Sequence, residues 1–164
     1  MDASARKLGL YEWSVLFCFL VIPVGLSVID SVVLRSAESP ADISLKWLTF
    51  SGIGLRLGSA GVKQIIQPLY TAKEIFQLKD ESAAPIVREL GFANLSFAVL
   101  ALLSLFFETF RVPAAIAGGS YFGLAGAAHV FRRHKGGEEV FAMVSDLFLF
   151  VALATLVVVT QLGH

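Results

Sequence analysis

The sequence predicts an all-α integral membrane protein, a helical bundle of five transmembrane helices. Hydrophobic residues make up 56% of its 164 residues, charged residues make up 16%, and the mean hydropathy is +0.75, well above the balance of soluble domains. Several apolar runs reach about 20 residues, enough to cross a hydrocarbon core of about 30 Å. We expect one membrane domain over residues 1–164, with an N-terminal anchor helix over 11–34 and a four-helix core over 45–162.

Composition excludes several classes of protein. The 13 basic and 13 acidic residues give a formal net charge of +0, which offers no electrostatic footprint for nucleic acid. Cys18 is the only cysteine, so the chain has no intramolecular disulfide, no CxxC pair and no cysteine-based metal cage. The expected partner is the lipid bilayer and not nucleic acid.

The first predicted helix, residues 11–34, is expected to be an uncleaved anchor. Arg6 and Lys7 before it resemble the start of a signal peptide. The apolar run is longer than the usual ~7–15 residues, however, and no Ala-x-Ala-like site follows it. Pro23 lies in the middle of the run and predicts a kink, because proline removes a backbone donor.

The second predicted helix is the least apolar. A linker over 35–44 turns at Ser39-Pro40, the helix begins near Leu45, and its span covers 47–69. Its polar residues are costly in lipid unless they face the bundle interior, and their spacing of i, i+7, i+8 and i+11 puts them on one face. These residues are Arg56, Lys63, Gln64 and Gln67. If this segment does not span, the topology has four helices.

The remaining segments include two with stripes of small residues. Residues 70–85 are amphipathic and predict a segment along the membrane surface. The span over 86–107 follows, and that over 112–131 repeats small residues at four-residue intervals, the pattern that lets helix backbones approach in a membrane. The last span covers 138–161. The stripes are Gly91, Asn94, Ala98 and Ala101 on the third helix, and Ala115, Gly119, Gly123 and Ala127 on the fourth.

The distribution of Lys and Arg near the span ends predicts the orientation. With five spans, nine of these residues fall on one side and three on the other. This bias predicts the inner (plasma) membrane, with a cytoplasmic N-terminus and an outer C-terminus. Four spans would place both termini outside.

Five alternating spans bring most of the polar residues to the inner side and predict a polar pocket there. We expect Asp146 to pair with Lys63 or Arg88 first and with His129 second, because a lone carboxylate at that depth is unstable as an anion. Two interpretations stay open: interhelical hydrogen bonds and snorkelling anchors, or a pocket for a polar head group, a quinone or a proton. The pocket candidates are Arg56, Lys63, Gln64, Gln67, Arg88, Glu89, Asn94, His129 and Asp146.

The sequence names no catalytic residue and predicts no metal site. His129 and His134 are five apart, about 140° around a helix, and so do not form the i, i+4 pair that two helical ligands need. No Ser-His-Asp order or glycine-rich phosphate loop occurs. We predict no cofactor, and whether the protein is an enzyme stays open.

Residues 55–159 resemble the DoxX-like group of small bacterial membrane proteins, and within it an uncharacterised family. The resemblance is carried by LRLGSAGVKQIIQP, by VRELGFANL, by the helix that ends GAAH and by Asp146. It implies a four-helix core, which would make residues 11–34 an added helix. Some members of the group are small membrane subunits of quinone-linked or thiol-linked oxidoreductase complexes.

Two functions from different classes are therefore compatible with the sequence. The first, which we prefer, is an accessory or binding membrane protein that holds a lipid or a partner subunit, with a homo-oligomer also compatible. The second is a membrane oxidoreductase component that binds quinone and moves protons through Glu89, His129 and Asp146. With a single cysteine the chain cannot run dithiol chemistry by itself.

Overall fold

The computed structural model describes residues 9–75, 80–131 and 136–163, and every regular element in these ranges is helical. Three helical stretches are long and apolar enough to cross a membrane: Leu10–Val33, Glu81–Leu103 and Glu139–Leu162. Their mean hydropathies are 2.4, 1.7 and 2.5. The prediction of an all-helical bundle is confirmed for the described residues, and three of its helices have the length and hydropathy of membrane spans.

We call a series of helical segments that follow one another without a gap a rod. The first rod continues through its proline, Pro23. It consists of α1 (Leu10–Leu16), η1 (Phe17–Val21), α2 (Ile22–Val28) and η2 (Ile29–Val33), where η1 and η2 are π-helical. Pro23 lies at the start of α2, directly after the π-turn of η1. Because a π-turn shifts the hydrogen-bond register by one residue, it accommodates the missing proline donor within the helix.

The second rod begins at Pro40, earlier than the predicted Leu45. Ser39 is the N-cap: its hydroxyl accepts a hydrogen bond from the Asp42 backbone N–H at 3.2 Å, and Pro40 takes the first helical position. This pair is a strong helix start, and its signal lay inside the predicted linker. The rod comprises α3 (Pro40–Leu48), π-helical η3 (Thr49–Leu55) and α4 (Arg56–Ile66).

The second rod ends at Gln67, whose φ of −127° and ψ of 57° break the helix before Pro68. A short helical extension follows, α5 (Pro68–Tyr70) and η4 (Thr71–Ile75). The other elements are η5 (Glu81–Ala83), α6 (Ala84–Leu103), η6 (Glu108–Phe110), α7 (Arg111–Val130) and α8 (Gly137–Leu162).

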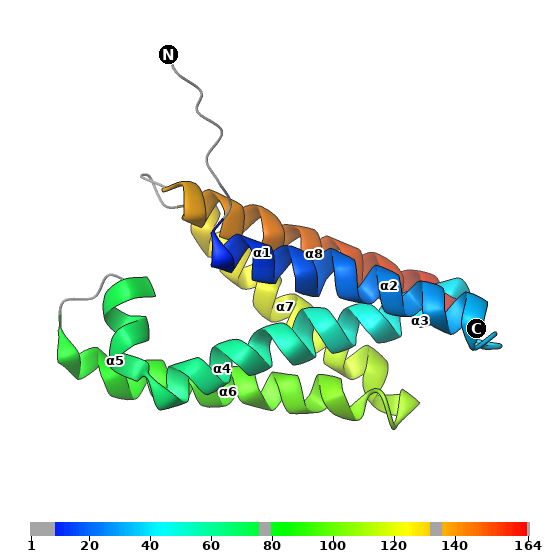
Figure 1. The fold of residues 1–164 in the computed structure, drawn as a ribbon, viewed down its shortest axis with the longest axis horizontal. Helices are drawn as coiled ribbons and strands as arrows, with labels where there is room; N and C mark the ends of the chain where they lie inside the picture. Colours follow the sequence, from blue (N-terminus) through cyan, green and yellow to red (C-terminus); the bar gives the residue numbers. More distant parts are fainter. Residues whose placement is uncertain (1–8, 76–79, 132–135, 164) are drawn as a thin grey trace, which may run out of the picture.

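Successive rods run in alternating directions, so the two ends of the described chain lie at opposite ends of the bundle (Figure 1). Two helix pairs dominate the packing: α4 lies along α6, and α7 lies along α8. The pairs are joined where α3 packs on α2 and α8 and where η3 packs on α6 and α7. We call this joined end, with residues 34–40 and 103–111, the narrow end, and the opposite end, with Gln67 and Gly137, the wide end.

The small-residue stripes make the close contacts within the pairs. The stripe on α6 is buried, and a Cβ at Gly61 of α4 would lie 2.8 Å from the carbonyl oxygen of Gly91. On α7, a Cβ at Gly123 would lie 2.8 Å from the ring of Phe150 in α8. The predicted packing role of both stripes is confirmed.

An ion-pair cluster fastens the narrow end. The buried Asp30 carboxylate accepts a hydrogen bond from Trp47 Nε1 at 2.8 Å and pairs with Lys46. Glu38 lies between Lys46, at 3.4 Å, and the buried Arg111, at 3.0 Å. The cluster links η2, α3 and the start of α7. It therefore holds three rods together at the end where the two helix pairs meet.

Candidate functional site

Arg56 lies at the point in the second rod where the rod changes neighbours, from α8 to α6. It is the first residue of α4, directly after η3, and its side chain is half-buried. The guanidinium carbon lies 5.2 Å from the centre of the Tyr11 ring, a cation–π contact with the first rod. The buried Arg56 Nε has no hydrogen-bond acceptor among the described residues.

Asp146 faces Arg56 from α8. Its carboxylate is half-buried, and the opposite charge that acts on it most strongly is Arg56, followed by His129. Among the residues that the structure describes, neither forms an ion pair with it within 4 Å. Arg56 and Asp146 therefore attract each other across the bundle without direct contact.

The expected first partners of Asp146 were wrong. The Lys63 ammonium lies 4.5 Å from the centre of the Tyr70 ring, near the end of α4, and Arg88 is exposed on α6. Arg56 takes their place, because it lies two helical turns nearer the middle of the second rod. The expected second partner, His129, does interact with Asp146.

Two tyrosines, Tyr11 and Tyr121, interact with this pair, and we call these four residues the polar centre. The sequence analysis missed both tyrosines. The hydroxyl of Tyr11 interacts with Arg56, and that of Tyr121 interacts with Asn94 and lies in the field of Asp146. Tyr121 also packs on Phe97, with ring centres 5.4 Å apart. The sequence gives only a weak signal for either residue. Tyr11 has the position of a tyrosine at the membrane–water interface, and Tyr121 is a single tyrosine in a helix rich in small residues.

From Asp146 the polar residues continue toward the wide end. His129 Nδ1 lies 3.0 Å from Glu139 Oε1, so α7 and α8 are joined there by an imidazole–carboxylate pair. His129 thus interacts with two carboxylates of the same helix, with Glu139 in direct contact and with Asp146 at longer range. Contact with the Glu139 carboxylate holds the imidazole in a fixed orientation.

The polar residues of α4 do not share one face as predicted. Gln64 turns toward α6, where its Oε1 accepts a hydrogen bond from Asn94 Nδ2 at 2.8 Å, and both side chains are buried. Lys63 and Gln67 are exposed on the other side. Gln64 and Asn94 therefore join α4 to α6, whereas Lys63 and Gln67 are free to face a ligand.

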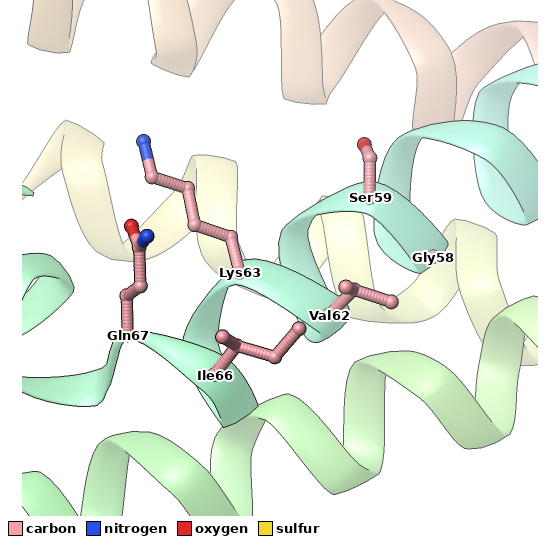
Figure 2. Close-up of a pocket in the computed structure, with 6 residues that line it drawn as sticks. All are labelled: Gly58, Ser59, Val62, Lys63, Ile66 and Gln67. Carbon is pink, nitrogen blue, oxygen red and sulfur yellow. The ribbon is translucent and has the colours of Figure 1, made fainter.

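A cleft runs along the exposed side of α4, toward the wide end. Its volume is about 410 Å³. Figure 2 shows Ser59, Lys63 and Gln67 pointing to the side of α4 away from α6, with Val62 and Ile66 beneath them. The cleft is lined by Gly58, Ser59, Val62, Lys63, Ile66 and Gln67.

The predicted pocket thus divides into separate groups. Arg56 and Asp146 interact across the bundle, and His129 lies on the wide-end side of Asp146. Gln64 and Asn94 lie between α4 and α6, and Lys63 and Gln67 line the cleft. Arg88 and Glu89 are exposed on α6. Arg88 and Glu89 neither line the cleft nor act on Asp146.

No cluster of three His, Cys, Asp or Glu side chains that could hold a metal occurs in residues 9–75, 80–131 or 136–163. His134, considered with His129 in the sequence, lies outside the described residues. The chemistry available here is electrostatic and acid–base: one guanidinium, one carboxylate and two phenols at the polar centre, with the His129–Glu139 imidazole–carboxylate pair beside them.

These features define a class: a helical bundle with three helices long and apolar enough to cross a membrane, a half-buried polar centre and a cleft toward one end of the bundle. A family model described as a family of unknown function, DUF6790, matches residues 13–163, and the chain belongs to this family. No curated protein and no solved structure matches the chain.

Proposed function

We propose that the protein is a five-span membrane protein with a cytoplasmic N-terminus and an outer C-terminus. Two further rods are long enough to be the fourth and fifth spans. The second rod is made of α3, η3 and α4, which follow one another with nine, seven and eleven residues, and α7 has 20 residues. At about 1.5 Å per residue each reaches the thickness of a hydrocarbon core. The alternating rod directions and the nine-to-three basic bias agree with this topology. The wide end is then the cytoplasmic end.

Its proposed role is that of an accessory or binding protein, whose polar centre holds a polar ligand or a partner subunit inside the inner half of the bilayer. The observation that carries this proposal is the relation between Arg56 and Asp146. The two charges face each other without contact, and the buried Arg56 Nε lacks an acceptor among the described residues. A polar group that accepts from Arg56 would satisfy this donor, and buried donors are normally satisfied.

Unbiased mass analysis of what co-purifies in mild detergent tests the role. We expect a stoichiometric small molecule or partner chain with the wild type and its loss from Asp146→Asn. The exposed Glu89→Gln is the matched control, since it also removes a carboxylate charge but lies away from the centre. If the Asp146→Asn variant retained the same co-purifying molecule or chain, this result would contradict the proposal.

The second candidate is a quinone-binding oxidoreductase component. The series Asp146, His129 and Glu139 supports it, since an imidazole between two carboxylates can pass a proton toward the wide end. In this case the co-purifying molecule would be a quinone, identified by its absorbance and mass. Glu89 has no part in this version, because it is exposed on α6.

A further inference from the structure

The cleft on α4 combines a polar row with an apolar row. Ser59, Lys63 and Gln67 recur at i, i+4 and i+8 and so stack along one side of the helix (Figure 2). Val62 and Ile66 lie beside them and are 46% and 70% exposed. A site that pairs hydrogen-bond donors with exposed aliphatic side chains fits an amphipathic ligand.

The charge of the cleft favours an anion. Lys63 is its one charged residue, and no carboxylate is among the residues that line it. In the described part of the chain the Lys63 ammonium forms no ion pair and instead lies over the Tyr70 ring, 4.5 Å from its centre. Its remaining N–H donors and the Gln67 amide are therefore available to a ligand, whereas the Ser59 hydroxyl already donates to the Arg56 carbonyl at 3.0 Å.

The depth of the cleft matches the level of lipid head groups. Gln67 directly follows the last residue of the second rod, since the helix breaks there before Pro68, and Lys63 lies one turn before it. A polar row at the end of a span lies where the hydrocarbon core gives way to the phosphate layer. A basic side chain near the cytoplasmic surface of a membrane attracts anionic head groups.

We propose that this cleft binds an anionic glycerophospholipid of the inner leaflet. Lys63 and Gln67 hold the phosphate, and an acyl chain lies along Val62 and Ile66. The proposal rests on the membrane placement of the proposed function, but it does not use the Arg56–Asp146 centre. The two proposals can therefore fail separately.

Thermal unfolding of the purified full chain in detergent, with added lipid, tests the proposal. We expect phosphatidylglycerol to raise the melting temperature more than phosphatidylcholine does. Native mass spectrometry should show about a fivefold preference for the anionic lipid, the size expected for one lysine near a membrane surface. Lys63→Gln should abolish this preference, and Lys63→Arg should keep it.

Lys73→Gln is the matched control, because Lys73 lies near the same end of the bundle and is also exposed, but it pairs with Glu81 at 2.8 Å and does not line the cleft. It should leave the preference unchanged. Equal loss from Lys63→Gln and Lys73→Gln would overturn the specific site and indicate general surface charge. Stabilisation by inorganic phosphate equal to that by phosphatidylglycerol would overturn the lipid and indicate a free-anion site.

The same preparations separate the two proposals. Asp146→Asn should keep the lipid preference even when it loses the ligand of the polar centre. If the wild type shows the lipid preference but no other molecule or chain co-purifies with it, only the proposed function fails. If Lys63→Gln keeps the full preference, only the lipid site fails.

Discussion

The backbones of α4 and α6 meet at Gly61 and Gly91, where a Cβ on Gly61 would lie 2.8 Å from the Gly91 carbonyl oxygen and 3.0 Å from the Leu95 amide nitrogen. Both obstacles are backbone atoms, which cannot move aside as a flexible side chain can. Contact between two helices at this distance depends on the absence of a side chain. It also places Gln64 within reach of Asn94, one turn away on each helix.

Gly61→Ala should therefore destabilise the protein by about 1 to 3 kcal/mol, the usual cost of overpacking a close contact. The control is Gly25→Ala in α2, where an added Cβ meets nothing within 4 Å. This control should be neutral or stabilising, since alanine favours helix over glycine by about 1 kcal/mol. Thermal unfolding in detergent measures both, and equal melting temperatures would show that α4 and α6 do not pack at Gly61.

Gly123→Leu should force α7 away from α8. A Cβ at Gly123 would already lie 2.8 Å from the Phe150 ring, so a whole leucine side chain cannot fit unless this ring or the helices shift. Leu124→Ile is the control, since Leu124 is 73% exposed on the neighbouring face. The melting temperature of Gly123→Leu should be clearly lower than that of the control. Equal melting of the two variants would mean that the glycine faces lipid.

The hydrogen bond between Asn94 and Gln64 should be measurable as a coupling energy. Each single variant, Asn94→Leu or Gln64→Met, leaves a buried amide without its partner, at a cost of about 1 to 3 kcal/mol. The double variant should be less destabilised than the sum of the singles. Strict additivity in a double-mutant cycle would contradict the contact.

The topology can be tested with reporter fusions at both termini. With five spans we expect a cytoplasmic signal at the N-terminus and an outer signal at the C-terminus. Termini on the same side would show an even number of spans. The rod from Pro40 to Ile66 would then be the first to reconsider, because it is not among the three apolar spans.

Much of the fold could be predicted from hydropathy and small-residue spacing, because lipid acts on whole helical segments. The helices over 10–33, 84–103 and 137–162 lie within a few residues of the expected ranges. The start of the second rod was missed because Ser39-Pro40 was interpreted as a turn, although the same pair is a strong helix cap.

The site could be predicted only in part, because helical periodicity does not say which neighbour each face meets. Lys63 and Gln64 are adjacent in the chain, yet Gln64 packs against α6 and Lys63 lines the cleft. Arg56 was recognised as polar and costly in lipid, but its role depends on η3, where the rod leaves α8 for α6. A change of packing partner within one helix leaves no periodic signal in the sequence.

The last prediction concerns the central pair, Arg56 and Asp146. Each charge is half-buried in the helical bundle, and removing Arg56 leaves Asp146 without its main opposite charge. Because the two groups do not touch, the coupling should fall in the range of about 0.5 to 3 kcal/mol and not at the higher values of direct buried pairs. Arg56→Met, Asp146→Asn and the double variant, compared by thermal unfolding, give this energy.

Lys63→Met combined with Asp146→Asn is the control cycle and should be additive, since Lys63 lies over Tyr70 near the end of α4. Coupling to Lys63 as strong as coupling to Arg56 would show that the carboxylate faces the cleft. If Asp146→Asn instead raises stability while a bound molecule is lost, the carboxylate serves binding at the expense of the fold, as expected of a functional charge in lipid.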